Sequence, residues 1–123
     1  MNLKWKRHVY TFKPVDYAVD EVKAIMGVKR GTYVRAVICR IGELFNGTVT
    51  LAIGDGTGAA DGFAATTDIT QGTVGLYPGY GTYFSGANGY LYTDDDTIDL
   101  TYNYTSVTDQ GLATIYIIHC DLE

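Results

Sequence analysis

Four aspartates close together in the chain are the first residues whose spacing suggests chemistry. Asp94, Asp95, Asp96 and Asp99 form the only acidic cluster of the sequence. Neighbouring carboxylates repel one another, and a hard cation such as Ca²⁺ would relieve this repulsion if the backbone curled around it. Hydrated Asp-rich turns are, however, ordinary loop chemistry. We therefore assign no metal site here, and whether the cluster holds a cation stays open.

Residues 54–63 (GDGTGAADGF) carry the glycine pattern of several ligand-binding loops. A phosphate-binding P-loop needs Gly-Lys-Ser/Thr, but no lysine follows Lys29. A calcium loop of the EF-hand type starting at Asp55 needs an oxygen ligand at its fifth position and glycine at its sixth, where Ala59 and Ala60 stand. The dinucleotide pattern Gly-x-Gly-x-x-Ala opens no helix here, so it lacks the N–H groups that hold phosphate. We expect no cofactor.

The two histidines indicate neither a metal site nor a catalytic base. His8 and His119 lie at opposite ends of the chain, and His119 and Cys120 point to opposite faces of an expected strand. These residues therefore cannot ligate one ion together. A side-chain nucleophile needs a base and an orienting carboxylate beside it, and the sequence has no local signature of such a set. We predict that the chain is not an enzyme and has no catalytic residues.

The two cysteines lie inside apolar runs, Cys39 in RAVICRI and Cys120 in TIYIIHC. This position is typical of small core residues. Two cysteines are too few for a disulfide framework, although a bridge between two expected strands is geometrically possible. The sequence leaves the pairing of Cys39 with Cys120 open.

Charge is divided unevenly along the chain. All nine Lys and Arg residues fall within residues 1–40 beside three carboxylates, whereas residues 41–123 hold 11 carboxylates and no Lys or Arg. Lys4, Lys6 and Arg7, next to Trp5, form a basic first stretch that suits an acidic partner surface, while charge runs are more commonly solvated faces. The net charge of −5 argues against nucleic acid as a partner. No apolar run is long enough to enter a membrane, and no secretory signal is apparent.

The composition favours β-structure, because the chain is rich in Gly, Thr and Tyr and holds only two prolines. The spacing predicts strands over 32–41, 48–53, 89–93, 97–104 and 112–122. Residues 21–28 fit a helical stripe or a strand, and we favour a strand after a helical turn near Asp16. The stretch 54–89 has ten glycines and should form loops, with short strands around Phe63 and Tyr83.

One domain over residues 1–123 accounts for this length, with residues 1–13 as a possible docking arm. About eight strands in such a unit predict an all-β, two-sheet antiparallel sandwich of the jelly-roll kind, with an up-and-down barrel as the alternative.

Six aromatic residues stand in a glycine-rich part of the chain: Tyr77, Tyr80, Tyr83, Phe84, Tyr90 and Tyr92. They suit a platform for sugar rings or a protein partner, or packing within the sandwich.

The stretch from 48 to 122 resembles small structural proteins of tailed bacteriophages, of the capsid decoration and head-fibre type. The residues that carry this resemblance are LAIGDG (51–56), Asp61-Gly62-Phe63, Asp68-Ile69, GYLYTDDDTIDLTY (89–102) and an apolar strand after Gly111, preceded by VKRGTYVRAVICRI (28–41). Together they cover about two thirds of the chain.

The resemblance implies a β-sandwich virion protein, trimeric, bound to the outside of a capsid and reinforcing the shell. It implies the major capsid protein or another virion protein as partner, synthesis in the host cytoplasm and no catalytic residues. Lys4, Trp5, Lys6 and Arg7 are then the expected capsid contacts, because they cluster beside an otherwise anionic domain. A carbohydrate-binding or host-attachment module of the tail or baseplate is the alternative function.

Overall fold

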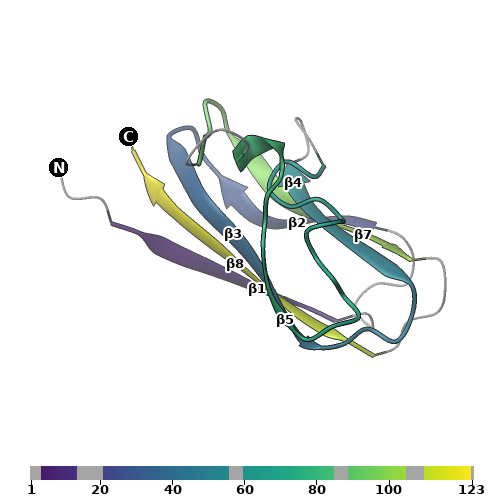
Figure 1. Ribbon diagram of the computed structural model, residues 1–123. Coiled ribbons are helices and arrows are strands. Elements are labelled where there is room, and N and C mark those ends of the chain that lie inside the picture. Colours follow the sequence, from purple (N-terminus) through teal and green to yellow (C-terminus); the bar gives the residue numbers. More distant parts are fainter. Residues whose placement is uncertain (1–3, 14–20, 56–59, 85–88, 105–109, 123) are drawn as a thin grey trace.

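A computed structural model describes residues 4–13, 21–55, 60–84, 89–104 and 110–122, which form two antiparallel sheets stacked face to face (Figure 1). The elements are β1 (Lys6–Phe12), β2 (Glu21–Val28), β3 (Thr32–Glu43), β4 (Val49–Asp55), β5 (Gly75–Pro78), the 3-10 helix η2 (Thr82–Phe84), β6 (Tyr90–Leu91), β7 (Asp96–Tyr104) and β8 (Leu112–Asp121). No helix among these described residues is long and apolar enough to span a bilayer.

The strand pairing is nested. β1 pairs with β8, β2 with β7 and β3 with β6, as if one long hairpin had been rolled up. The larger sheet has the order β1-β8-β3-β5, with β6 also on β3, and the smaller sheet has the order β2-β7-β4. Two open sheets joined in this way form a jelly roll. The predicted all-β sandwich is therefore confirmed, and the alternative of an up-and-down barrel is wrong.

The core fills the space between the sheets. Along β8, Ala113, Ile115 and Ile117 are fully buried, whereas the residues between them are partly exposed. This alternation places every second side chain of the larger sheet inward and the others on its outer face. The largest buried side chains include Tyr102, Phe12, Phe63, Ile41, Leu51, Ile53, Ile98 and Leu100.

A loop packs its aromatic residues against the end of the core. Phe63 is fully buried, and its ring lies 5.1 Å from Tyr83, 5.4 Å from Phe84 and 6.0 Å from Tyr90. Tyr83 donates a hydrogen bond of 2.9 Å to the buried carboxylate of Asp55. Four tyrosines of this region pack in or against the core: Tyr77, Tyr83, Tyr90 and Tyr92. Of the six aromatic residues considered as a sugar platform, only Tyr80 is largely exposed, so packing is the better interpretation.

Backbone contacts hold this loop so closely that one glycine has no room for a side chain. Gly81 donates a backbone hydrogen bond to Phe63, and Tyr83 donates one to Gly62. A Cβ atom at Gly81 would lie 2.3 Å from the carbonyl oxygens of Asp61 and Gly62. The approach of these two backbone segments therefore requires glycine at position 81.

The predicted strands at 21–28, 32–41, 48–53, 97–104 and 112–122 are confirmed within two residues at each end. The strand predicted at 89–93 is shorter, covering Tyr90–Leu91. Tyr83 lies in a 3-10 helix instead of a strand, and the described residues near Phe63 form only an isolated bridge, between Ile53 and Ala64. β1 and β5 were not predicted as strands. The helical turn expected near Asp16 lies outside the described residues.

Candidate interaction surface

The outer face of the five-stranded sheet collects apolar and cationic side chains from four strands. Strand register and alternation place three rows of side chains on it, each of which starts at β1 and runs across the sheet. They are Arg7, Ile118 and Ala36; Val9, Tyr116, Ile38 and Pro78; and Thr11, Thr114, Arg40 and Leu76. The middle row has no polar side chain other than the Tyr116 hydroxyl. A broad sheet face of this composition is unusual for a surface in contact with water.

Arginines lie over aromatic rings on this face. The Arg7 guanidinium carbon lies 5.8 Å from the centre of the Tyr116 ring. A bulge between Val34 and Ala36 inserts Arg35, whose guanidinium carbon lies 5.8 Å from the Trp5 ring. With Arg40, the face holds three of the four arginines of the chain. Contact with aromatic rings orders the side chains of Arg7 and Arg35 and keeps their charge on the face.

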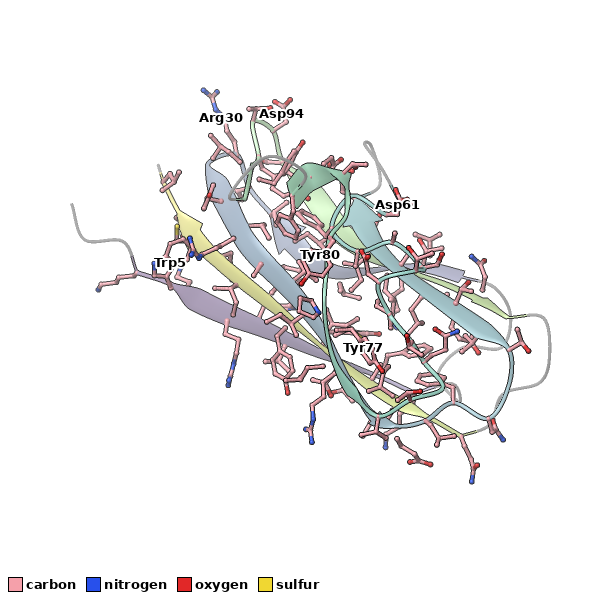
Figure 2. All side chains as sticks on the ribbon, viewed as in Figure 1. Trp5, Arg30, Asp61, Tyr77, Tyr80 and Asp94 are labelled. Carbon is pink, nitrogen blue, oxygen red and sulfur yellow. The ribbon has the colours of Figure 1, made fainter. Side chains whose placement is uncertain are left out.

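Carboxylates are missing from these rows. None of the described residues assigned to the three rows is Asp or Glu, and Glu43, in register with Leu112, lies beyond the last row. Trp5, labelled in Figure 2, lies at the opposite end of the face from Glu43. Its ring centre is 6.1 Å from that of Tyr33. The face is therefore cationic, while the molecule as a whole has a net charge of −5.

Most of the exposed large hydrophobic side chains gather on or beside this face. Nine such side chains are exposed among the described residues, and six belong here: Trp5, Val9, Leu76, Tyr80, Leu91 and Leu122. One open groove borders its rows, and a second lies beyond them near the start of β3. The first, of about 360 Å³, is lined by Arg35, Ala36, Val37, Pro78, Gly79, Tyr80 and Phe84. The second, of about 390 Å³, is lined by Arg30, Gly31, Leu91, Tyr92, Thr93 and Leu122.

The four residues expected to contact a capsid do not all lie on the same side of the larger sheet. Trp5 and Arg7 lie on the outer face, whereas Lys6 follows the opposite alternation and forms a 3.1 Å ion pair with Asp121. Both partners of that pair are 56% exposed, so it adds little stability. Lys4 is exposed. Residues 6–12 of the expected docking arm are not separate from the sandwich, because they form β1 and bury Phe12 completely.

Arg35 and Arg40 were missed by the sequence analysis. They share a sheet face with Arg7 only through the pairing of β1 and β3 with β8, which joins segments far apart in the chain. A local signal was present, since Arg40 alternates with the apolar Cys39 and Ile41 and must therefore point away from the core.

Solved structures share this fold. No protein-family model matches the chain, and no curated protein sequence matches it. A chain of the acidic stable capsid structure of Helicobacter pylori bacteriophage KHP30 superposes with a TM-score of 0.69 at 10% identity, covering 97% of this chain and 89% of that one. The chain has a fold that phage capsids use.

Two further capsids contain the same fold. The match in the capsid asymmetric unit of cyanophage Pam1 has a TM-score of 0.68 at 16% identity and covers 97% of this chain and 84% of that one. The match in the capsid of Ralstonia phage GP4 has a TM-score of 0.63 at 12% identity and covers 98% and 84%. The resemblance to phage virion proteins inferred from the sequence is confirmed at the level of the fold.

Within this capsid-type fold, the two cysteines are free and point to opposite faces of the larger sheet. Cys39 faces the core opposite Ile115, and Cys120 lies on the outer side opposite Tyr33. Five residues along β8 separate their positions, or about 17 Å, which is too far for a disulfide. Burial raises the pKa of the Cys39 thiol to about 12. Cys39 is therefore an inert core residue.

Cys120 offers a test of the packing around Trp5. Its side chain is fully buried although it faces away from the core. Cys120 pairs with Tyr33, whose ring centre lies 6.1 Å from that of Trp5, and Trp5 directly precedes the Lys6–His119 pair. We expect Trp5→Ala to expose Cys120, so that one thiol per folded chain reacts with a thiol reagent under conditions in which the wild type is inert. Mass spectrometry identifies the labelled cysteine. Val9→Ala is the control, and an unreactive Trp5→Ala variant would contradict this arrangement.

Three of the four clustered aspartates accept separate local hydrogen bonds. Asp95 accepts from the backbone N–H of Arg30 at 3.0 Å, and Asp96 accepts from Thr97 N–H. Asp99 is buried in β7 and accepts from the Thr97 hydroxyl at 2.8 Å. Over the described part of the chain, no three His, Cys, Asp or Glu side chains are grouped as metal ligands would be.

The histidines, far apart in the sequence, are neighbours in the fold. Pairing of β1 with β8 sets His119 opposite Lys6 and His8 opposite Ile117, so both rings point inward from adjacent strands. The expectation that the two histidines lie far apart, because they stand at opposite ends of the chain, is therefore wrong. His8 makes a 2.7 Å hydrogen bond with the carbonyl oxygen of Ile25 in β2 and so ties the two sheets together.

His119 predicts a pH dependence of stability. Desolvation lowers the pKa of its ring, with Lys6 and His8 adding to the effect and Asp121 opposing it. In the unfolded chain His119 has the ordinary pKa of about 6.5, so the unfolded chain takes up a proton at a higher pH than the folded chain does. The stability of the fold is therefore retained above that pH and falls as the pH drops below it. We expect His119→Gln to lose less thermal stability than the wild type between pH 7.5 and 5.5. Equal losses would contradict the role of His119.

Proposed function

We propose that the chain is a non-enzymatic structural protein of a phage virion, and within the virion a decoration protein that binds the outer capsid surface and stabilises the shell. The observation that carries the proposal is the match of 97% of the chain to chains of phage capsids. The cationic, apolar sheet face supports it, because a protein that reinforces a shell needs a broad contact surface rather than a reactive cleft.

We also propose where the protein acts and with which partners. The partner is the major capsid protein or another virion protein, the chain acts as a homotrimer, and it reaches the particle from the host cytoplasm. Lys4, Trp5, Lys6 and Arg7 belong to the contact with the capsid. Trp5 and Arg7 are the best placed of these four for that role, since both lie on the outer face of the larger sheet.

Particles of the encoding phage, assembled without this protein, provide the test. Purified protein added to them should sediment with the capsids, reach saturation at a fixed number of copies and raise the temperature at which the particles break open. Absence of binding would contradict the decoration role, and binding only to tails would place the protein elsewhere in the virion. Light scattering tests the trimer, which requires a mass near three times 13.4 kDa.

A further inference from the structure

We infer that the whole outer face of the five-stranded sheet is a protein-docking surface, and that it fits a partner protein surface that carries carboxylates among apolar side chains. This inference deepens the proposed function and rests on it. It extends the contact from the first residues of the chain to β3, β5 and β8 and adds Arg35, Arg40 and Tyr80 to the contact.

The composition of the face is that of a protein interface. Protein contacts are enriched in Trp, Tyr and Arg and depleted in Lys, Asp and Glu. The face holds three arginines, with Trp5, Tyr116 and several aliphatic side chains, and its rows contain none of the described Lys, Asp or Glu residues. Surfaces that bind nucleic acid use lysine together with arginine and lie on domains of positive net charge, whereas this chain has a net charge of −5.

Charge also argues against a second copy of the chain in a two-fold contact on this face. A two-fold contact sets the same patch of both copies against each other. Arg7, Arg35 and Arg40 would then meet the same arginines across rows that contain no carboxylate, with Glu43 only beyond the last row, and like charges at an interface are strongly unfavourable. The complementary surface is one in which carboxylates stand opposite these three guanidinium groups.

The groove beside Tyr80 gives the face an anchoring point. It has a volume of about 360 Å³ and lies between Arg35 on β3 and Pro78 at the end of β5. Tyr80 at its rim is 74% exposed, while its backbone is held by a 2.9 Å hydrogen bond from its N–H to the Asp68 carboxylate. A fixed backbone with an exposed aromatic ring loses little entropy on binding and is typical of residues that dominate binding energy.

Charge reversal on the face is the test, with binding to the same phage particles measured by sedimentation. Arg7→Glu, Arg35→Glu and Arg40→Glu together should weaken binding by about 100-fold or more, because each variant side chain then faces a carboxylate. The control reverses Lys23 on β2 and Lys29 in the turn after it, both away from the face, and should leave binding within about threefold. It is compared with the double variant Arg7→Glu and Arg40→Glu, which makes the same change of net charge on the face. Tyr80→Ala removes a side chain that is 74% exposed and not part of the core, and it should weaken binding about tenfold.

The outcomes separate the inference from the function. If the wild type does not bind particles, the decoration role fails and the inference fails with it. If the wild type binds and the arginine and Tyr80 variants bind equally well, only the inference is overturned. Equal losses in the lysine control would mean that overall charge, not this face, drives binding. A wild-type oligomer that the arginine variant splits into monomers would make the face a contact between copies and overturn the stated partner.

Discussion

Phe12→Ala is expected to lower the free energy of unfolding by about 3–5 kcal/mol, the usual cost of removing a buried phenylalanine ring. Phe12 is fully buried at the end of β1, with its ring centre 5.8 Å from that of Phe45 and 5.0 Å from that of Tyr102. Tyr102 belongs to the other sheet, so the ring joins the two layers. Domains of this size are stable by about 5–15 kcal/mol, which makes the loss large enough to measure by urea denaturation.

Val9→Ala on the same strand is the matched control. Val9 points to the outer face and is 44% exposed, so its loss should change the stability by less than about 0.5 kcal/mol. A small effect of Phe12→Ala would mean that residues 6–12 are a separate arm after all. The comparison therefore tests directly whether the first strand is an integral part of the sandwich.

Gly81→Ala is expected to cost about 3 kcal/mol, at the upper end of the range for overpacking. The added Cβ would meet backbone carbonyl oxygens of Asp61 and Gly62 at 2.3 Å, and backbone cannot move aside as the end of a flexible side chain can. Relief requires the loop to separate, which disturbs the packing of Phe63 against Tyr83. Thermal unfolding followed by circular dichroism measures the loss.

Gly72→Ala is the control for this substitution. A Cβ atom at Gly72 would meet nothing within 4 Å, so the exchange should be neutral or slightly stabilising. If both variants unfold at the same temperature, the close contact between residues 61–62 and Gly81 is not a feature of the folded protein.

The sequence predicted the central strands because their side chains alternate clearly. β3, β7 and β8 have apolar residues at alternate positions over most of their length, which is sufficient to recognise a half-buried strand. β1 escaped recognition because the pattern at an open edge is weaker: Lys6 and His8 occupy inward positions near the rim, where water still reaches them. β5 is four residues long and ends in proline, which is typical of a turn.

Only part of the interaction surface was predictable from the sequence, because its residues come from strands that are distant in the chain. Trp5 and Arg7 are adjacent to other basic residues in the chain and were singled out for that. Arg40 lies in a strand recognised for its buried residues, and nothing in the sequence gives the register that aligns it with Thr114 and Thr11. Local patterns predict which way a side chain points, but the neighbours across a sheet depend on pairing between distant segments.

The nested pairing of the strands has a consequence for synthesis of the protein. β8 lies between β1 and β3, and Lys6 pairs with His119, more than 100 residues later in the chain. The larger sheet therefore cannot form until its last strand has been translated, and pairing over such distances is slow. During translation β1 and β3 have no partner between them, and their edges need protection from other nascent chains. The outer face is complete only in a finished molecule, so a chain that ends before β8 would present no docking surface to an assembling particle.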